Sequence, residues 1–219
     1  MSRVINCEKR CALCGENSTY RVLASTSSFG SPDLDLRPPP LRRHTMSWWV
    51  EECPNCGYVA KDIEKECGAW VEDFIKGEEY LTCSGINFKD PLAARFYREY
   101  LLAAGKRDAE AAYNAILCAA WCCDDTAGEA KNAVKCRRLA LVQIDKLLKR
   151  GSARNKDTLT VVKADIMRRA GEFDRLISEY AEIQLSDRLH ARIIAFELEK
   201  AKRRDDGRYT VEDTEEDNS

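Results

Sequence analysis

Sequence patterns of catalysis are scarce in this chain, and their scarcity argues against several classes of enzyme. Only two of the 219 residues are histidines, His44 and His190, and no nucleophile–base constellation is visible. The chain also lacks a glycine-rich phosphate loop, a Gly-x-Ser-x-Gly sequence and a His-Glu-x-x-His sequence. These patterns mark many nucleotide-binding proteins, hydrolases and metalloproteases. The sequence therefore predicts no catalytic residue, and we expect His190 to be a surface residue.

Long apolar runs and a strong net charge are also missing. No apolar run reaches the roughly 20 residues that a membrane-spanning helix needs, and residues 1–6 lack the apolar core of a signal peptide. The formal net charge is −2, so the chain as a whole is not drawn to nucleic acid or to an anionic membrane. We therefore expect a cytoplasmic protein without membrane association, in which the eleven cysteines stay reduced. Their odd number also argues against a disulfide framework.

Two Cys-x-x-Cys-Gly sequences, at residues 11–15 and 53–57, are the most informative feature that is present. Two residues between paired cysteines let both sulfurs reach one ion at about 2.3 Å, and four thiolates are a ligand set that tetrahedral zinc prefers. The glycine that follows each pair accepts a positive φ, so the chain can turn around the metal. The sequence predicts one structural Zn²⁺ in a closed site whose ligands are Cys11, Cys14, Cys53 and Cys56.

Other interpretations of these cysteines stay open at this point. A Cys-x-x-Cys pair can be a redox pair or a disulfide. The spacing Cys7-x-x-x-Cys11-x-x-Cys14 also occurs in radical enzymes that hold an iron–sulfur cluster, but those enzymes need a large α/β barrel. That interpretation would also leave the second Cys-x-x-Cys unexplained. If the four cysteines of the two pairs bind the metal, Cys7 is either an additional thiol near the site or a core residue. His44 is a possible substitute ligand, but we expect it to be a loop residue.

The rest of the chain has a helical period, which predicts an α+β fold that is mainly α. We expect helices over residues 91–105, 109–120, 126–150, 159–170, 173–180 and 186–202, and short strands over 20–24 and 47–51. The capping signals are Asp90-Pro91, a Thr126-x-x-Glu129 capping box and Ser186.

These elements predict three parts of the chain. A zinc-ribbon module with a long Pro-rich loop covers residues 1–60, and stacked antiparallel helical hairpins cover 61–204. Residues 205–219 contain seven acids and one arginine, which predicts a disordered acidic tail. The stretch 164–180 is similar to the middle of a tetratricopeptide repeat, with a small residue, a glycine and two aromatics at its spacing. It departs from that pattern at Thr160 and Leu176.

A set of residues before the helical region forms a recognisable combination of motifs: Cys11, Cys14, Asp33 to Pro39, Trp49, Val50, Cys53, Cys56, Gly57 and Tyr58. With the helices that follow, this combination resembles a bacterial family of uncharacterised zinc-ribbon proteins, which is known as a domain of unknown function. The resemblance covers most of the chain, but its sharp motifs lie between residues 11 and 58. It implies a zinc site and a helical repeat domain, and it supplies no reaction.

The loop over residues 31–44 and the tryptophans after it are further candidate binding residues. The loop's charged side chains can hold an anion or can pair with one another in solvent, and we favour the pairing. Trp48 and Trp49 are adjacent, so in a strand they would point to opposite faces, one into the ribbon's core. The other would anchor a partner or pack on the helices, and we favour packing. The loop candidates are Asp33, Asp35, Arg37, Arg42 and Arg43.

The remaining cysteines are expected to pack in the core. Cys118 and Cys122 share a helix face, and with Cys123 and Cys136 they offer the alternative of a second metal site. Free cysteine is among the most often buried residues, so we favour core packing for these four and for Cys67 and Cys83.

The favoured function is a zinc-dependent binding module for a protein or peptide partner. Nucleic-acid binding through the ribbon is a second alternative, which we disfavour because residues 1–60 carry seven basic and six acidic side chains and lack a basic stripe. A metal-dependent enzyme is the third alternative, although four cysteines would leave no open position for water.

Overall fold

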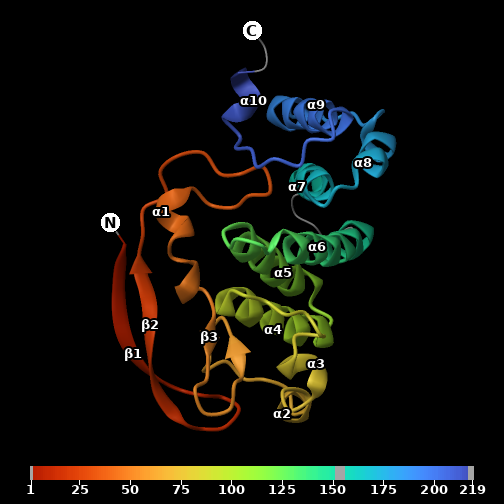
Figure 1. Cartoon of the computed structure of the whole chain (residues 1–219). Helices are drawn as coiled ribbons and strands as arrows, with labels where there is room; N and C mark the ends of the chain where they lie inside the picture. Colours follow the sequence, from red (N-terminus) through yellow and green to blue (C-terminus); the bar gives the residue numbers. More distant parts are fainter. Residues whose placement is uncertain (1, 151–155, 217–219) are drawn as a thin grey trace.

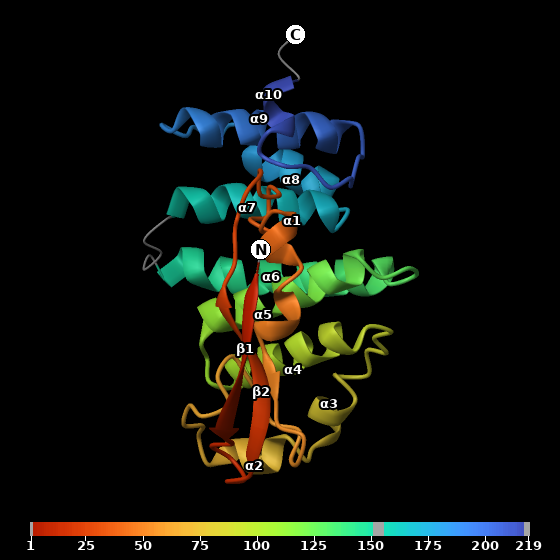
Figure 2. The same ribbon diagram turned by 90° about the vertical axis from the view of Figure 1, so that its left-hand side faces the viewer.

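The computed structural model describes residues 2–150 and 156–216, and its fold is α+β and mainly α. Two small antiparallel sheets lie in the first 60 residues, and helices stacked in layers make up most of the rest (Figure 1). We call residues 2–60 the N-terminal segment. Seen from the side, this segment runs along one face of the helical stack, from α2 at one end towards α7 (Figure 2).

The two sheets are hairpins, and each hairpin turns at one of the Cys-x-x-Cys-Gly sequences. Strands β1 (Arg3–Arg10) and β2 (Asn17–Ser25) pair on either side of residues 11–15. Strands β3 (Glu51–Glu52) and β4 (Val59–Ala60) pair on either side of residues 53–57. Gly15 and Gly57 have φ angles of +78° and +74°, the left-handed conformation that glycine adopts without strain. The expected role of these two glycines is confirmed.

The long helices follow the sequence periodicity closely. Aspartates cap three of them: Asp90 accepts a hydrogen bond from Leu92 N, Asp108 from Ala111 N and Asp187 from His190 N. The last of these replaces the predicted cap Ser186. The long helices are α4 (Pro91–Gly105), α5 (Ala109–Asp124), α6 (Ala130–Arg150), α7 (Lys156–Arg169), α8 (Phe173–Tyr180) and α9 (Arg188–Lys202).

The predicted capping box at the start of α6 does not form. Thr126 Oγ1 donates backwards to Cys122 O at 3.0 Å, at the end of the preceding helix. The Glu129 carboxylate accepts from Lys89 N at 2.9 Å instead of returning to its own helix start. Glu129 therefore ties the entry of α4 to the entry of α6. The predicted helix end at Gly151 lies outside the described residues.

Several short helices were not expected from the sequence. The prediction of a strand over residues 47–51 is wrong for Trp48 and Trp49. Met46–Trp48 form a 3₁₀ helix, η1, in which backbone N–H groups bond back to the preceding turn, and only Glu51 reaches a strand. The aromatic and β-branched residues there suit a strand by propensity, but local packing overrides that preference. The other short helices are α1 (Pro40–Arg43), α2 (Trp70–Phe74), α3 (Glu78–Leu81) and α10 (Asp213–Glu216).

The helices of the stack pack against their neighbours in chain order, from α4 to α9. One continuous apolar core joins them to the two hairpins, with Ile116, Ile144 and Ile166 fully buried along the stack. Within the described part of the chain, none of the helices is both long and apolar enough to cross a membrane.

The prediction of a disordered tail is wrong for residues 205–216. Arg168, which is fully buried, donates to the carbonyl oxygens of Asp205 and Gly207 at 2.9 and 2.8 Å. Tyr209 stacks edge-on against Phe196 of α9, with ring centroids 5.1 Å apart. Residues 209–211 also bond to the loop that contains Pro32 and Leu34. The acidic composition suggested disorder, but these contacts fix the segment. Residues 217–219 lie outside the described residues.

Candidate metal centre

Four cysteine sulfurs meet where the turns of the two hairpins face each other. All four Sγ atoms lie within 4.8 Å of one another. Within residues 2–150 and 156–216, this is the one group of three or more histidine, cysteine, aspartate or glutamate side chains placed to hold a metal ion. The group is Cys11, Cys14, Cys53 and Cys56.

The spacing of the sulfurs fits a metal tetrahedron and does not fit disulfides. Cys11 Sγ lies 3.8 Å from Cys56 Sγ, and Cys14 Sγ lies 3.6 Å from Cys53 Sγ. A tetrahedron with metal–sulfur bonds of about 2.3 Å has edges of about 3.8 Å. A disulfide would need about 2.05 Å, and all eleven cysteines are free. These residues can therefore hold one metal ion with four sulfur donors.

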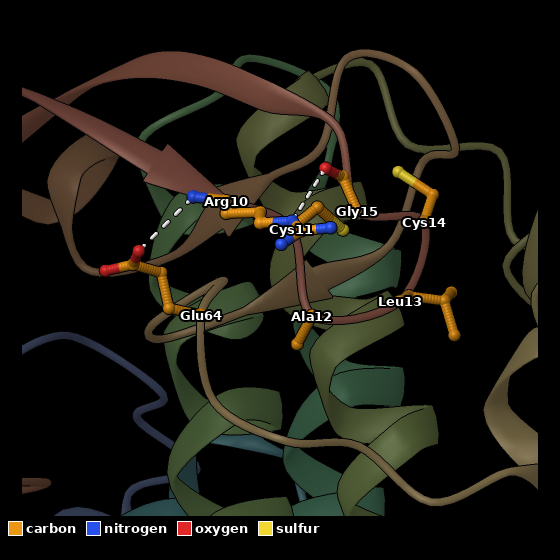
Figure 3. A pocket seen from close by; sticks show the side chains of 7 residues that line it. All are labelled: Arg10, Cys11, Ala12, Leu13, Cys14, Gly15 and Glu64. Atoms are coloured by element: carbon orange, nitrogen blue, oxygen red, sulfur yellow. Dashed lines mark hydrogen bonds between the residues drawn. The ribbon is translucent and has the colours of Figure 1, made fainter.

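The first turn is shaped to present its sulfurs (Figure 3). Cys11 is buried and Cys14 is exposed, so the two sulfurs sit at different depths. Arg10 closes the turn, because its Nε donates to Gly15 O at 3.0 Å. The backbone N–H of Arg10 donates to the Glu64 carboxylate at 3.2 Å, which holds the chain after the second hairpin against the first.

Burial and hydrogen bonds shift the pKa values of the cluster's thiols in the metal-free protein. Burial raises the pKa of Cys11 and Cys56, and backbone N–H donors oppose this rise. At Cys14, burial also favours the neutral thiol, but hydrogen bonds from the Asn55 amide and the backbone N–H of Glu16 outweigh it and lower the pKa to about 7. Asn55 Nδ2 lies 3.5 Å from Cys14 Sγ. A bound cation would ionise all four thiols.

The cluster is connected to the helical stack on two sides. Tyr80 of α3 donates its hydroxyl to Gly57 O of the second turn at 2.7 Å. Glu52 of β3 accepts from Arg95 Nε of α4 at 3.0 Å and also pairs with Arg98. A metal ion that orders the cysteine turns would therefore also position the N-terminal segment on α3 and α4.

The other cysteines and His44 lie outside the cluster. Cys7 stands on β1 opposite Tyr20 of β2, and His44 is an exposed residue at the end of α1. The second metal site considered for the α5 and α6 cysteines is not among the groups found in the described residues. Cys122, Cys123 and Cys136 are buried, as expected for core residues.

The charged loop was expected to pair in solvent, and this is wrong for Asp33, Asp35 and Arg37. Asp35 and Arg37 have no exposed surface, and Asp33 is 2% exposed. Asp35 Oδ2 accepts from Trp121 Nε1 of α5 at 2.7 Å and from Arg169 Nη1 of α7 at 2.9 Å. Its partners lie on helices far away in the sequence, so no local pattern predicted the burial.

The arginines of the loop divide between internal and surface positions. Arg37 pairs with Asp125 at the end of α5 through both terminal guanidinium nitrogens, Nη1 and Nη2. Arg43 Nη2 donates to Asp33 Oδ1 at 2.6 Å. Burial, and then the nearby Asp35 charge, raise the pKa of Asp33, and Arg43 opposes both. Arg42 is exposed.

The two tryptophans play different roles. Trp48 lies under Arg21 of β2, whose guanidinium carbon is 5.4 Å from the indole centroid. Trp49 packs towards the helices, as favoured from the sequence, and with Arg42 it lines a cavity against α4 and α5. The sequence did not single out Glu99, which lines the same cavity. The sequence signal that could have identified Glu99 is its position as a single acid on the mainly apolar face of α4.

Comparison of the chain with models of known protein families, with curated proteins and with solved structures gave no match. The resemblance to a zinc-ribbon family therefore stays a prediction. What the geometry establishes is a mainly helical protein in which two β-hairpins present a four-cysteine group that can hold a metal ion.

Replacing Cys53 and Cys56 together by serine is expected to abolish metal binding and unfold the hairpins, because metal binding and folding are coupled at such sites. Cys7→Ser is the matched control, since Cys7 lies outside the cluster. Native mass spectrometry reports bound metal, and circular dichroism reports structure. Metal retained by the double variant, or lost from Cys7→Ser, would contradict the assignment of ligands.

The buried carboxyl of Glu99 is expected to make the free energy of unfolding depend on pH. Burial raises its pKa from 4.5 to about 7, opposed by the nearby Lys61. The folded state therefore binds the Glu99 proton more tightly than the unfolded state, and this contribution to stability falls as the pH rises from about 4.5 to about 7. Glu99→Gln should be more stable than the wild type above pH 7, by up to roughly 3 kcal/mol, and the gain should vanish near pH 4. Urea unfolding across this range measures it, and a pH-independent difference would contradict it.

Proposed function

We propose that this chain is a zinc-binding protein in which one structural Zn²⁺ organises the N-terminal segment and the helical stack binds a protein or peptide partner. The observation that carries the proposal is the separation of the sulfurs, 3.8 and 3.6 Å across the two hairpins. That separation suits zinc–sulfur bonds of about 2.3 Å in a tetrahedron.

The donor set supports a structural role for the metal. Four thiolates fill a tetrahedral shell and leave no position for substrate or water. The group joins residues about 40 positions apart in the chain, since Cys14 and Cys53 are separated by 39 residues. Zinc would supply a crosslink between two hairpins. Eleven free cysteines suit a reducing compartment, so a cytoplasmic location is part of the proposal, as is the zinc-ribbon family resemblance over residues 11–58.

The helical stack supports the partner-binding role. Helices stacked in chain order form an extended surface, which other helical solenoids use to bind partners. The nucleic-acid alternative loses its main support, because Arg37 and Arg43 are engaged by Asp125 and Asp33. No observation on the described residues favours it over a protein partner.

Metal analysis of the purified protein tests the first half of the proposal. We expect one zinc per chain, no visible absorption band, and four sulfur neighbours in X-ray absorption of the zinc edge. Tetrahedral sulfur sites also accept iron. A stoichiometric content of iron with visible absorption would therefore contradict the proposal.

Affinity capture tests the second half. A tagged wild-type chain and the Cys7→Ser control should capture the same protein, and the purified partner should bind in a saturable manner by calorimetry. The Cys53→Ser, Cys56→Ser double variant separates binding by the N-terminal segment from binding by the stack. A salt-sensitive shift of nucleic acid at physiological ionic strength, without a protein partner, would contradict this half and leave the zinc site standing.

A further inference from the structure

A cavity of about 350 Å³ lies between the N-terminal segment and helices α4 and α5. Leu36 and Trp49 line it from the N-terminal segment, and Lys61 lines it from just after that segment. Phe96 and Glu99 of α4 and Trp121 of α5 line it from the stack. We call this the Glu99 cavity. It lies apart from the four-cysteine group, with which it shares no residue.

The floor of the Glu99 cavity is aromatic carbon. Phe96 and Trp121 are 1% and 7% exposed. The indole N–H of Trp121 is used by Asp35 at 2.7 Å, and that of Trp49 is used by Thr45 Oγ1 at 2.8 Å. Neither tryptophan therefore has a donor left for the cavity. An apolar body would fit against these walls.

Glu99 stands out against this floor because one oxygen of its carboxylate is buried without a hydrogen-bond donor. The side chain is 93% buried, since 7% of its surface is exposed, and Oε2 has no hydrogen-bond partner in the described part of the chain. Burial raises its pKa to about 7, with Lys61 opposing the rise. A buried carboxyl oxygen without a donor is costly to the fold, and a buried acid with a raised pKa beside a cavity is typical of ligand-binding sites.

The rim of the cavity carries the opposite charge. Arg42 and Lys61 are exposed lining residues. A ligand with one positive charge can place that charge at Glu99. Its uncharged end can then lie at the rim, where it meets no electrostatic repulsion from Arg42 and Lys61. A second positive charge at that other end would be repelled. The charge pattern therefore disfavours a ligand that carries a second amine at that other end.

We infer that the Glu99 cavity binds a small primary monoamine with an apolar body, whose ammonium group donates to the Glu99 carboxylate between Trp49, Phe96 and Trp121. Ammonium groups are also attracted to aromatic rings. The backbone at the rim contains one strained residue, and such strain is common at ligand-binding sites. Leu36 has a φ of +66°, which is strained for a leucine, and its half-exposed side chain lines the cavity.

The four tryptophans provide a direct test by NMR of their indole N–H signals. Titration with n-hexylamine should shift the signals of Trp49 and Trp121 in a saturable manner. The signals of Trp48 and Trp70, which do not line the cavity, should stay in place. Hexane-1,6-diamine tests the repulsion at the rim and should bind at least about tenfold more weakly. Hexanoate, with the same body and a negative charge, should not bind at Trp49 and Trp121.

Two variants test the role of Glu99. Glu99→Gln keeps the shape of the side chain and should weaken hexylamine binding at least about tenfold, the effect of losing a hydrogen bond between charged groups. Glu110→Gln, an exposed acid on α5, should bind like the wild type, and unfolding curves confirm that both variants are folded. Undiminished binding by Glu99→Gln, binding of hexanoate in place of the amine, or no shift with hexylamine would each overturn the inference. These results do not depend on the identity of the bound metal or on a protein partner.

Discussion

The two hairpins of the N-terminal segment depend on the four-sulfur group, because they bury too little apolar surface to be stable alone. A two-stranded hairpin is at best marginal in water, and β3 and β4 are each two residues long. The cysteine turns bring both hairpins to one point, and Tyr80 and Glu52 join that point to α3 and α4. A metal at the four sulfurs would therefore support a segment that has no adequate core of its own.

The other end of the N-terminal segment is attached by a different interaction. Asp35 is buried between α5 and α7, where Trp121 and Arg169 both donate to it. Breaking a buried pair of this kind leaves an uncompensated charge and costs about 3–5 kcal/mol. The segment is thus attached to α3 and α4 by Gly57 and Glu52, which flank the second cysteine turn, and to α5 and α7 by buried polar contacts of Asp35. The Glu99 cavity lies between these two attachments, which explains why two separate parts of the chain line it.

The sequence could predict the features that depend on neighbouring residues. Helix α4 begins and ends where Asp90-Pro91 and Gly105 place its ends, and the cysteine turns follow from spacing and glycine. The burial of Asp35 could not be predicted, because its partners Trp121 and Arg169 lie 86 and 134 residues away. The ordering of residues 205–216 depends in the same way on Arg168. The surroundings of Glu99 also depend on residues far away in the sequence, because Leu36 and Trp49 line the same cavity.

The central claim is that a metal at the four cysteines holds the hairpins while the buried ion pairs hold the loop independently. Hydrogen exchange measured with and without a chelator tests it most directly. The account predicts that metal removal exposes the amides of residues 3–25 and 51–60, while residues 33–37 and helices α5 and α7 keep their protection. Equal protection of the hairpins in the metal-free protein would contradict it.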